Sequence, residues 1–81
     1  MTIKIGSVPM IFNHQRFGND CLARRLHLRM KVSDIADLIE TSASVISRYE
    51  RGTEPNLHMN VFLKMCNVFD LDPREYFELE H

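Results

Sequence analysis

Residues 33–52, SDIADLIETSASVISRYERG, constrain the fold of this 81-residue chain more than any other segment. Its apolar residues recur at helical spacing on both sides of a short polar break, at Ile35, Ala36, Ile39, Ile46 and Tyr49. Ser42 is a good N-cap residue, and Gly52 suits the left-handed position that ends a helix. We therefore expect two short helices, over residues 32–39 and 43–51, joined by a tight turn.

The segment before this pair divides into an arm and a helix. Residues 1–18 are punctuated by two glycines and a proline and are rich in β-branched residues, so they do not favour a helix. We expect either one short strand or an arm that packs elsewhere, either of which needs a partner strand or a groove, or else a partly ordered tail. A helix is expected from Asn19 to Arg29, capped by Asn19 or Asp20, with Leu22 and Leu26 on one face.

Two more helices are expected after the pair. Residues 57–69 carry a wide apolar stripe that Asn56 can cap, and this helix is either a central core helix or one that also meets a second subunit. A short fifth helix starts at Asp72, with Pro73 in its first position and Tyr76 folding back on the core. Phe77 is expected to fold back in the same way. The predicted architecture is all-α, with five helices in a domain over residues 19–78 and a non-helical N-terminal arm over residues 1–18.

Composition narrows the class of protein. Hydrophobic residues make up 44% of the chain, which fits one globular domain, and no apolar run is long enough to cross a membrane. Without the pattern of a signal peptide, we expect a cytoplasmic location. Cys21 and Cys66 lack metal or redox spacing, and we interpret them as core residues rather than a disulfide. The last three residues, Leu79-Glu80-His81, are a candidate tag remnant.

The charge is unevenly distributed although the formal net charge is only −1. Residues 1–33 contain six basic residues and one acidic residue, a balance of +5, whereas residues 34–56 and residues 57–81 each have a balance of −3. A nucleic-acid partner requires a positive face rather than a positive total. The polarised chain is therefore compatible with DNA binding, with modest non-specific affinity.

Two short helices joined by a tight turn, with small polar and basic side chains on the outside of the second, form the layout of a helix-turn-helix. From Leu22 to Phe77 the chain resembles the Cro/C1-type (XRE) helix-turn-helix family of phage repressors and small bacterial regulators. Ala36 matches the small residue where the two helices cross, and Glu50-Arg51-Gly52 matches the family's E-x-G ending. The resemblance implies a lambda-repressor-like fold, and it implies that Glu50 pairs with Arg25 in a partly buried, bidentate ion pair.

The chain departs from the family pattern at three positions. Val32 stands where the family often has a phosphate-binding glutamine, Glu40 replaces the glycine of the turn, and Thr41 replaces an apolar residue. Glutamate in a left-handed conformation costs about 1 kcal/mol relative to glycine. We therefore expect the same fold, with a slightly reshaped turn and a weaker phosphate clamp at the second helix.

The family reads DNA bases with the first turns of the third helix. By resemblance, the base contacts fall on Ala43, Ser44, Ser47 and Arg48, of which Arg48 is the strongest candidate because its fork fits guanine O6 and N7. The backbone contacts fall on Lys31, Ser42, Val45, Arg51, Thr53 and Asn56, helped by the N-termini of the second and third helices. The alternatives are that the serines form an ordinary polar helix face and that Arg48 is a surface charge without a base contact.

The basic side chains of Arg16, Arg24 and Arg29 can add positive charge or simply be solvated. No enzyme is expected, because the histidines are scattered without paired acids or ligand spacing, at His14, His27, His58 and His81. No cofactor or metal is expected either. These observations predict a sequence-specific transcriptional regulator, a repressor that binds an inverted repeat in double-stranded DNA as a homodimer. The alternative is a protein-interaction module on the same fold, such as an antitoxin or an anti-repressor.

Overall fold

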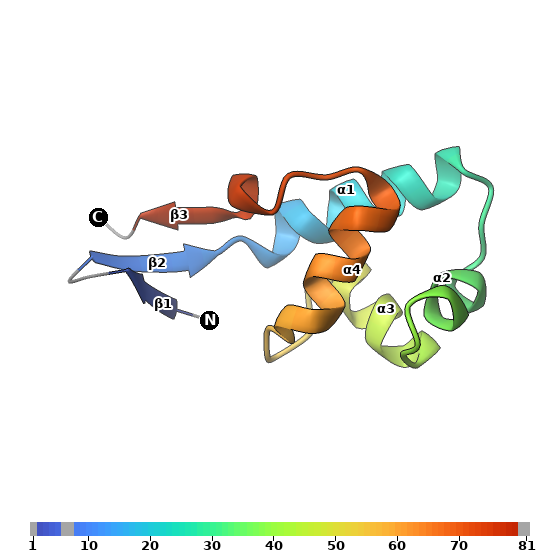
Figure 1. Cartoon of the computed structure of the whole chain (residues 1–81), viewed down its shortest axis with the longest axis horizontal. Helices are drawn as coiled ribbons and strands as arrows, with labels where there is room; N and C mark the ends of the chain where they lie inside the picture. Colours follow the sequence, from blue (N-terminus) through green and yellow to red (C-terminus); the bar gives the residue numbers. More distant parts are fainter. Residues whose placement is uncertain (1, 6–7, 80–81) are drawn as a thin grey trace.

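The computed structural model describes residues 2–5 and 8–79 and consists of a helical body with a small sheet at one end (Figure 1). The elements in chain order are β1 (Thr2–Ile5), β2 (Val8–Phe12), α1 (His14–His27), α2 (Val32–Leu38), α3 (Ala43–Arg51), α4 (Met59–Phe69), the 3₁₀ helix η1 (Pro73–Tyr76) and β3 (Phe77–Leu79). The lambda-repressor-like helical fold is confirmed. The helix count differs from the expected five, because the last helix is a single 3₁₀ turn, capped by Asp72 as predicted.

Helix α1 begins at His14, so the predicted start at Asn19 is wrong. The side chain of Asn13 caps the helix by accepting a hydrogen bond from the Arg16 N–H at 2.9 Å. Gly18 lies inside the helix, where a Cβ would overlap the Tyr49 carbonyl oxygen and come within 2.8 Å of the Glu50 carbonyl oxygen. This glycine permits close approach of α1 and α3, and its role in packing explains why it does not end the helix.

The inner face of α1 also differs from the prediction. Phe17, Gly18 and Cys21 are buried, whereas Leu22 is half-buried and Leu26 is 60% exposed. At about 100° per residue Leu26 lies on the opposite side of the helix from Phe17, so a helix that buries Phe17 and Cys21 exposes Leu26. Cys21 and Cys66 are free and buried, as expected.

The N-terminal arm forms two strands of an antiparallel sheet in the order β1-β2-β3. β1 and β2 form a hairpin, and β3, from the other end of the chain, pairs with β2 so that Met10 lies opposite Leu79 and Phe12 opposite Phe77. The expected need for a partner strand is confirmed, whereas the predicted tail is wrong and the arm has two strands rather than one. Leu79, considered as a tag remnant, is a strand residue, whereas Glu80 and His81 lie outside the described residues.

An aromatic cluster joins the arm to the helices. The ring of Phe12 meets the rings of Phe17, Phe62 and Phe77 with centroids 5.6, 5.1 and 5.3 Å apart. Phe17 and Phe62 are themselves 4.8 Å apart, in an edge-to-face arrangement. Because Phe12 is only 2% exposed, the end of β2 is part of the hydrophobic core rather than an appendage.

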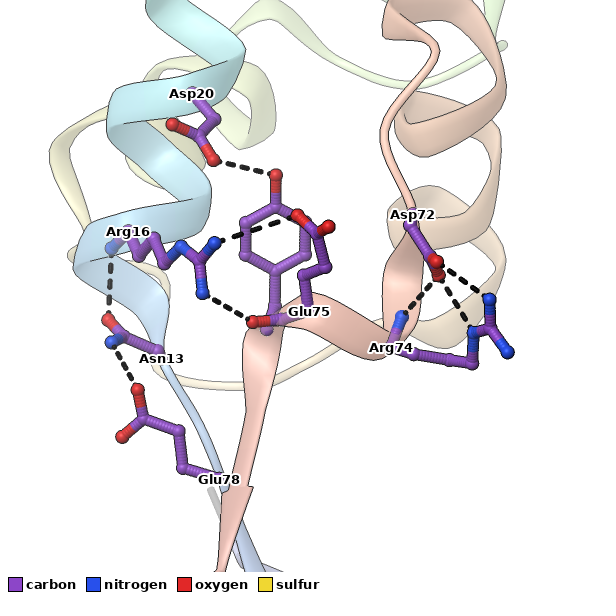
Figure 2. A network of polar contacts seen from close by, with 8 residues as sticks. Asn13, Arg16, Asp20, Asp72, Arg74, Glu75 and Glu78 are labelled. Atoms are coloured by element: carbon purple, nitrogen blue, oxygen red, sulfur yellow. Dashed lines mark hydrogen bonds and ion pairs between the residues drawn. The ribbon is translucent and has the colours of Figure 1, made fainter.

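Polar contacts tie the start of α1 to the C-terminal segment (Figure 2). Arg16 donates from Nη1 to the Glu75 carbonyl oxygen at 2.9 Å, and the Tyr76 hydroxyl donates to Asp20 at 2.7 Å. Asn13 also donates to the Glu78 carboxylate at 3.0 Å. These bonds fix η1 and β3 against α1, and they place Arg16 in a pair with Glu75.

Helix α4 begins at Met59, two residues after the predicted start, and His58 rather than Asn56 occupies the N-cap position. The His58 N–H donates to the Tyr49 hydroxyl at 2.9 Å, which holds the loop before α4 against α3. Phe62 and Met65 are among the buried residues of this helix, whereas Leu63 is 46% exposed. The helix is thus a core helix with one side open.

Candidate nucleic-acid interface

Helices α2 and α3 pack against each other with the pattern that the sequence indicated. All five apolar positions of the motif are at most 4% exposed, namely Ile35, Ala36, Ile39, Ile46 and Tyr49. The Ser42 side chain caps α3 by accepting a hydrogen bond from the Val45 N–H at 3.3 Å. Gly52 ends α3 with a φ of 70°, the left-handed conformation expected of it.

The turn between α2 and α3 keeps a left-handed residue although no glycine is present. Glu40 has a φ of 59°, and the Thr41 N–H after it donates to the Ala36 carbonyl oxygen at 2.9 Å. This bond closes the end of α2 as a glycine-containing turn would. The fold therefore tolerates the strain of a glutamate at this position, and the exposed Glu40 carboxylate lies next to the start of α3.

The amino end of α3 is open within the described part of the chain. Ser42, Ala43 and Ser44 are exposed, whereas Ser47 and Arg48 are half-exposed on the following turn. Val45 is half-buried and packs against the core. The candidate phosphate contacts at Lys31, Arg51, Thr53 and Asn56 are all exposed. The helix therefore presents its small polar residues, with Arg48 beside them, to the outside.

The start of α2 is less suited to an anion than the start of α3. The Lys31 N–H donates to the Asp34 carboxylate at 2.8 Å, so an acidic side chain already occupies one donor at this helix end. At α3 the cap is a neutral serine, and its first turn holds no acidic residue. Phosphate is therefore favoured more strongly at α3.

Arg25 and Glu50 form a bidentate ion pair between α1 and the end of α3. Arg25 donates from Nε and from Nη2 to the two carboxylate oxygens, at 2.6 and 3.0 Å, and from Nη1 to the Met30 carbonyl oxygen at 3.0 Å. The two side chains are 13% and 7% exposed, and the hydrogen bond that Arg25 donates to Glu50 raises the pKa of Arg25. This pair fixes the orientation of α3 on α1 and anchors the loop that leads into α2.

A second ion pair lies at the outer face of α3. Arg48 donates from Nε to a Glu54 carboxylate oxygen at 2.8 Å, and the other oxygen is 3.5 Å from Nε2 of His58. Glu54 is 4% exposed, and the hydrogen bond from Arg48 holds the pKa of its carboxyl below the ordinary value. Sequence reasoning counted Glu54 only as a negative charge, because no helical or strand spacing links residues 48 and 54 across the end of a helix.

The basic residues of α1 do not form one cluster. Arg16 is paired with Glu75, whereas Arg24 lies eight residues further along the helix, about 12 Å away at the usual rise. Arg24 and Arg29 are exposed at the end of α1 that leads to α2. Of the three arginines, Arg24 and Arg29 are therefore the ones that lie in the segment leading to Lys31 and α2.

Within residues 2–5 and 8–79, no group of three or more metal-ligating side chains comes together. None of the helices in this part of the chain combines the length and the apolar composition needed to cross a bilayer.

The family to which this chain belongs is shown by comparison with known proteins. A sequence model described as helix-turn-helix matches residues 22–76, which include α2, the turn and α3. The chain is also similar to the crystal structure of the restriction-modification controller protein C.AhdI from Aeromonas hydrophila, at 26% identity and a TM-score of 0.66, over 79% of this chain and 96% of that one. A comparison with curated proteins gives no match. The protein is a member of the XRE family of helix-turn-helix, DNA-binding transcription regulators.

Proposed function

We propose that this protein is a sequence-specific repressor that binds an inverted-repeat operator in double-stranded DNA as a homodimer. The observation that carries the proposal is the open amino end of α3, where Ser42, Ala43 and Ser44 are exposed while the opposite face of the helix is buried. An α-helix with one free polar face fits the major groove. Half-sites about 34 Å apart would then match two copies related by a two-fold axis.

The contacts divide into two kinds. Base edges would be contacted by Ala43, Ser44, Ser47 and Arg48. Of these, Arg48 would donate two hydrogen bonds to guanine O6 and N7. Lys31, Ser42, Val45, Arg51, Thr53 and Asn56 would lie along the sugar-phosphate backbone, with the free N–H groups of the first turn of α3 aimed at a phosphate. The likeness to a restriction-modification controller protein supports gene control as the purpose of this binding.

The test is selection of DNA from a pool of inverted repeats with randomised half-sites, followed by titration of the selected operator. We expect wild type to bind the selected sequence at least about 10³-fold more tightly than a scrambled duplex. Arg48→Ala should lower the affinity for the selected operator about tenfold and relax the preference for one guanine. Arg51→Ala should weaken binding to both duplexes and make the salt dependence shallower by about one unit.

The assembly is tested separately, by sedimentation of the protein alone and of its operator complex. Two protomers on one operator are expected, and binding of a single protomer to a single half-site would contradict the homodimer. If no duplex is preferred at all, the second candidate function is favoured, that of a protein-interaction module. Its support is the exposed apolar surface of Leu38 and Leu63, which are 59% and 46% exposed.

A further inference from the structure

The loop between α3 and α4 holds a carboxylate that the proposed contacts do not use. Glu54 is 4% exposed although it lies in a loop, and its immediate partners are the Arg48 Nε, the Asn56 backbone N–H and the His58 imidazole. A buried carboxylate is costly unless it is paired. Its main partner here is the arginine at the outer face of α3.

The pair constrains how Arg48 can meet a base. A guanidinium has five N–H donors in one plane, and the bond from Nε to Glu54 uses one of them. In the described contacts neither terminal nitrogen of Arg48 donates within the protein, and the side chain is 41% exposed. The bond therefore holds one edge of the planar group against Glu54, and the end-on pair of N–H bonds, one from each terminal nitrogen, stays available for a base.

We propose that Glu54 is a positioning residue for base recognition, which holds Arg48 so that its two terminal nitrogens meet guanine O6 and N7 end-on. The inference rests on the proposed function and adds to it the residue that sets the geometry of readout. An arginine already held in its bound conformation loses less side-chain entropy on binding. The buried carboxylate also offsets the arginine's charge, so Glu54 favours sequence preference over general attraction to phosphate.

The test is a double-mutant cycle on the operator selected by wild type, with a scrambled duplex measured in parallel. Glu54→Gln removes the charge and keeps the shape. We expect it to weaken operator binding about tenfold, and to leave scrambled-duplex binding within about twofold of wild type or slightly tighter, because one negative charge is gone. Because the effect acts through Arg48, adding Glu54→Gln to Arg48→Ala should change operator binding by less than about twofold. The matched control is Glu40→Gln, the same chemical change at an exposed acid beside α3, which should cause no loss.

Folding is checked by circular dichroism and thermal melting of every variant. Should Glu54→Gln fail to fold, Glu54→Asp keeps the charge but draws the carboxylate back from Arg48, and the same tenfold loss on the operator is expected. The inference is overturned if operator binding is unchanged or tighter in the Glu54 variant, or if the loss persists undiminished in the Arg48→Ala background. If wild type prefers no sequence, the proposed function fails and this inference fails with it, whereas the other outcomes leave DNA recognition standing.

Discussion

The Arg25–Glu50 pair gives a prediction whose size follows from the structure. Arg25→Met removes the guanidinium and keeps most of the apolar stem, so the Glu50 carboxylate, 7% exposed, loses both of its donors. The third hydrogen bond that is lost is the one from Arg25 to the Met30 carbonyl oxygen. Breaking a buried pair from one side costs about 3–5 kcal/mol, because the remaining charge is left unpaired. Since small domains have free energies of unfolding of about 5–15 kcal/mol, this one change should remove a large share of the stability.

The measurement is urea denaturation followed by far-UV circular dichroism, since the chain has no tryptophan. We expect Arg25→Met to lower the free energy of unfolding by about 3 kcal/mol, and a loss of that size corresponds to a melting temperature roughly 12–24 °C lower for a domain of this length. The matched control is Arg24→Met, the neighbouring exposed arginine on α1, which should stay within about 0.5 kcal/mol of wild type.

A double variant tests whether the unpaired, buried carboxylate of Glu50 is the cause of the lost stability. Arg25→Met combined with Glu50→Leu removes both charges, so no carboxylate is left buried alone, and the double variant should be more stable than Arg25→Met by itself. The reasoning is refuted if Arg25→Met costs less than about 1 kcal/mol, or if the double variant loses the sum of the two single losses.

Two other predictions concern stability. Gly18→Ala should lower the free energy of unfolding by about 3 kcal/mol in the same assay, since the new Cβ meets backbone carbonyls of α3 that cannot move aside, and a gain of about 1 kcal/mol, as in an ordinary helix interior, would contradict this close contact. Arg48 holds the pKa of the Glu54 carboxyl below its ordinary value of 4.5, so the ionised group stabilises the fold above that pH, and the stabilisation is lost as the pH falls through the lower folded-state pKa. Stability measured from pH 6 down to pH 3 should therefore fall less steeply for Glu54→Gln than for wild type, and parallel curves would contradict the assignment.

The parts of the fold that the sequence predicted well are those fixed by neighbouring residues. Ser42 and Gly52 bracket α3 with local capping chemistry, and the apolar spacing of Ile46 and Tyr49 follows from the helical period alone. The left-handed turn at Glu40 was predicted from the family pattern. Conformational propensity alone would have argued against a glutamate at this position. Local signals and the resemblance together thus located the motif.

The parts that the sequence did not predict depend on residues far apart in the chain. Gly18 has the local character of a helix breaker, and its real role appears only when α3 lies against α1. Phe12 appeared to belong to an arm, because its partners Phe62 and Phe77 come from the other half of the chain. Strand β3 has only three residues and follows the 3₁₀ turn η1 directly, so it gave no pattern of its own.

The candidate site shows the same division. The exposure of Ala43 and Ser44 follows from the helical period, whereas the bond from Arg48 to Glu54 depends on how the chain returns after Gly52. A charge sum assigned Glu54 to an acidic stretch, whereas in the folded protein it is paired with the arginine. Which bases these residues meet is a prediction that the operator selection tests.

Because β3 is the last described element of the chain and pairs with β2, the sheet can be completed only at the end of synthesis. Asn13 and Glu78, which join these two segments, are 65 residues apart, so all four helices are synthesised before the strand that completes the sheet. Until that strand emerges, β2 has an unpaired edge and the ring of Phe12 lacks its neighbour Phe77. A chain that ends before residue 77 therefore contains α2 and α3 but lacks the strand that pairs with β2, and we expect proteases to cleave it faster than the full chain.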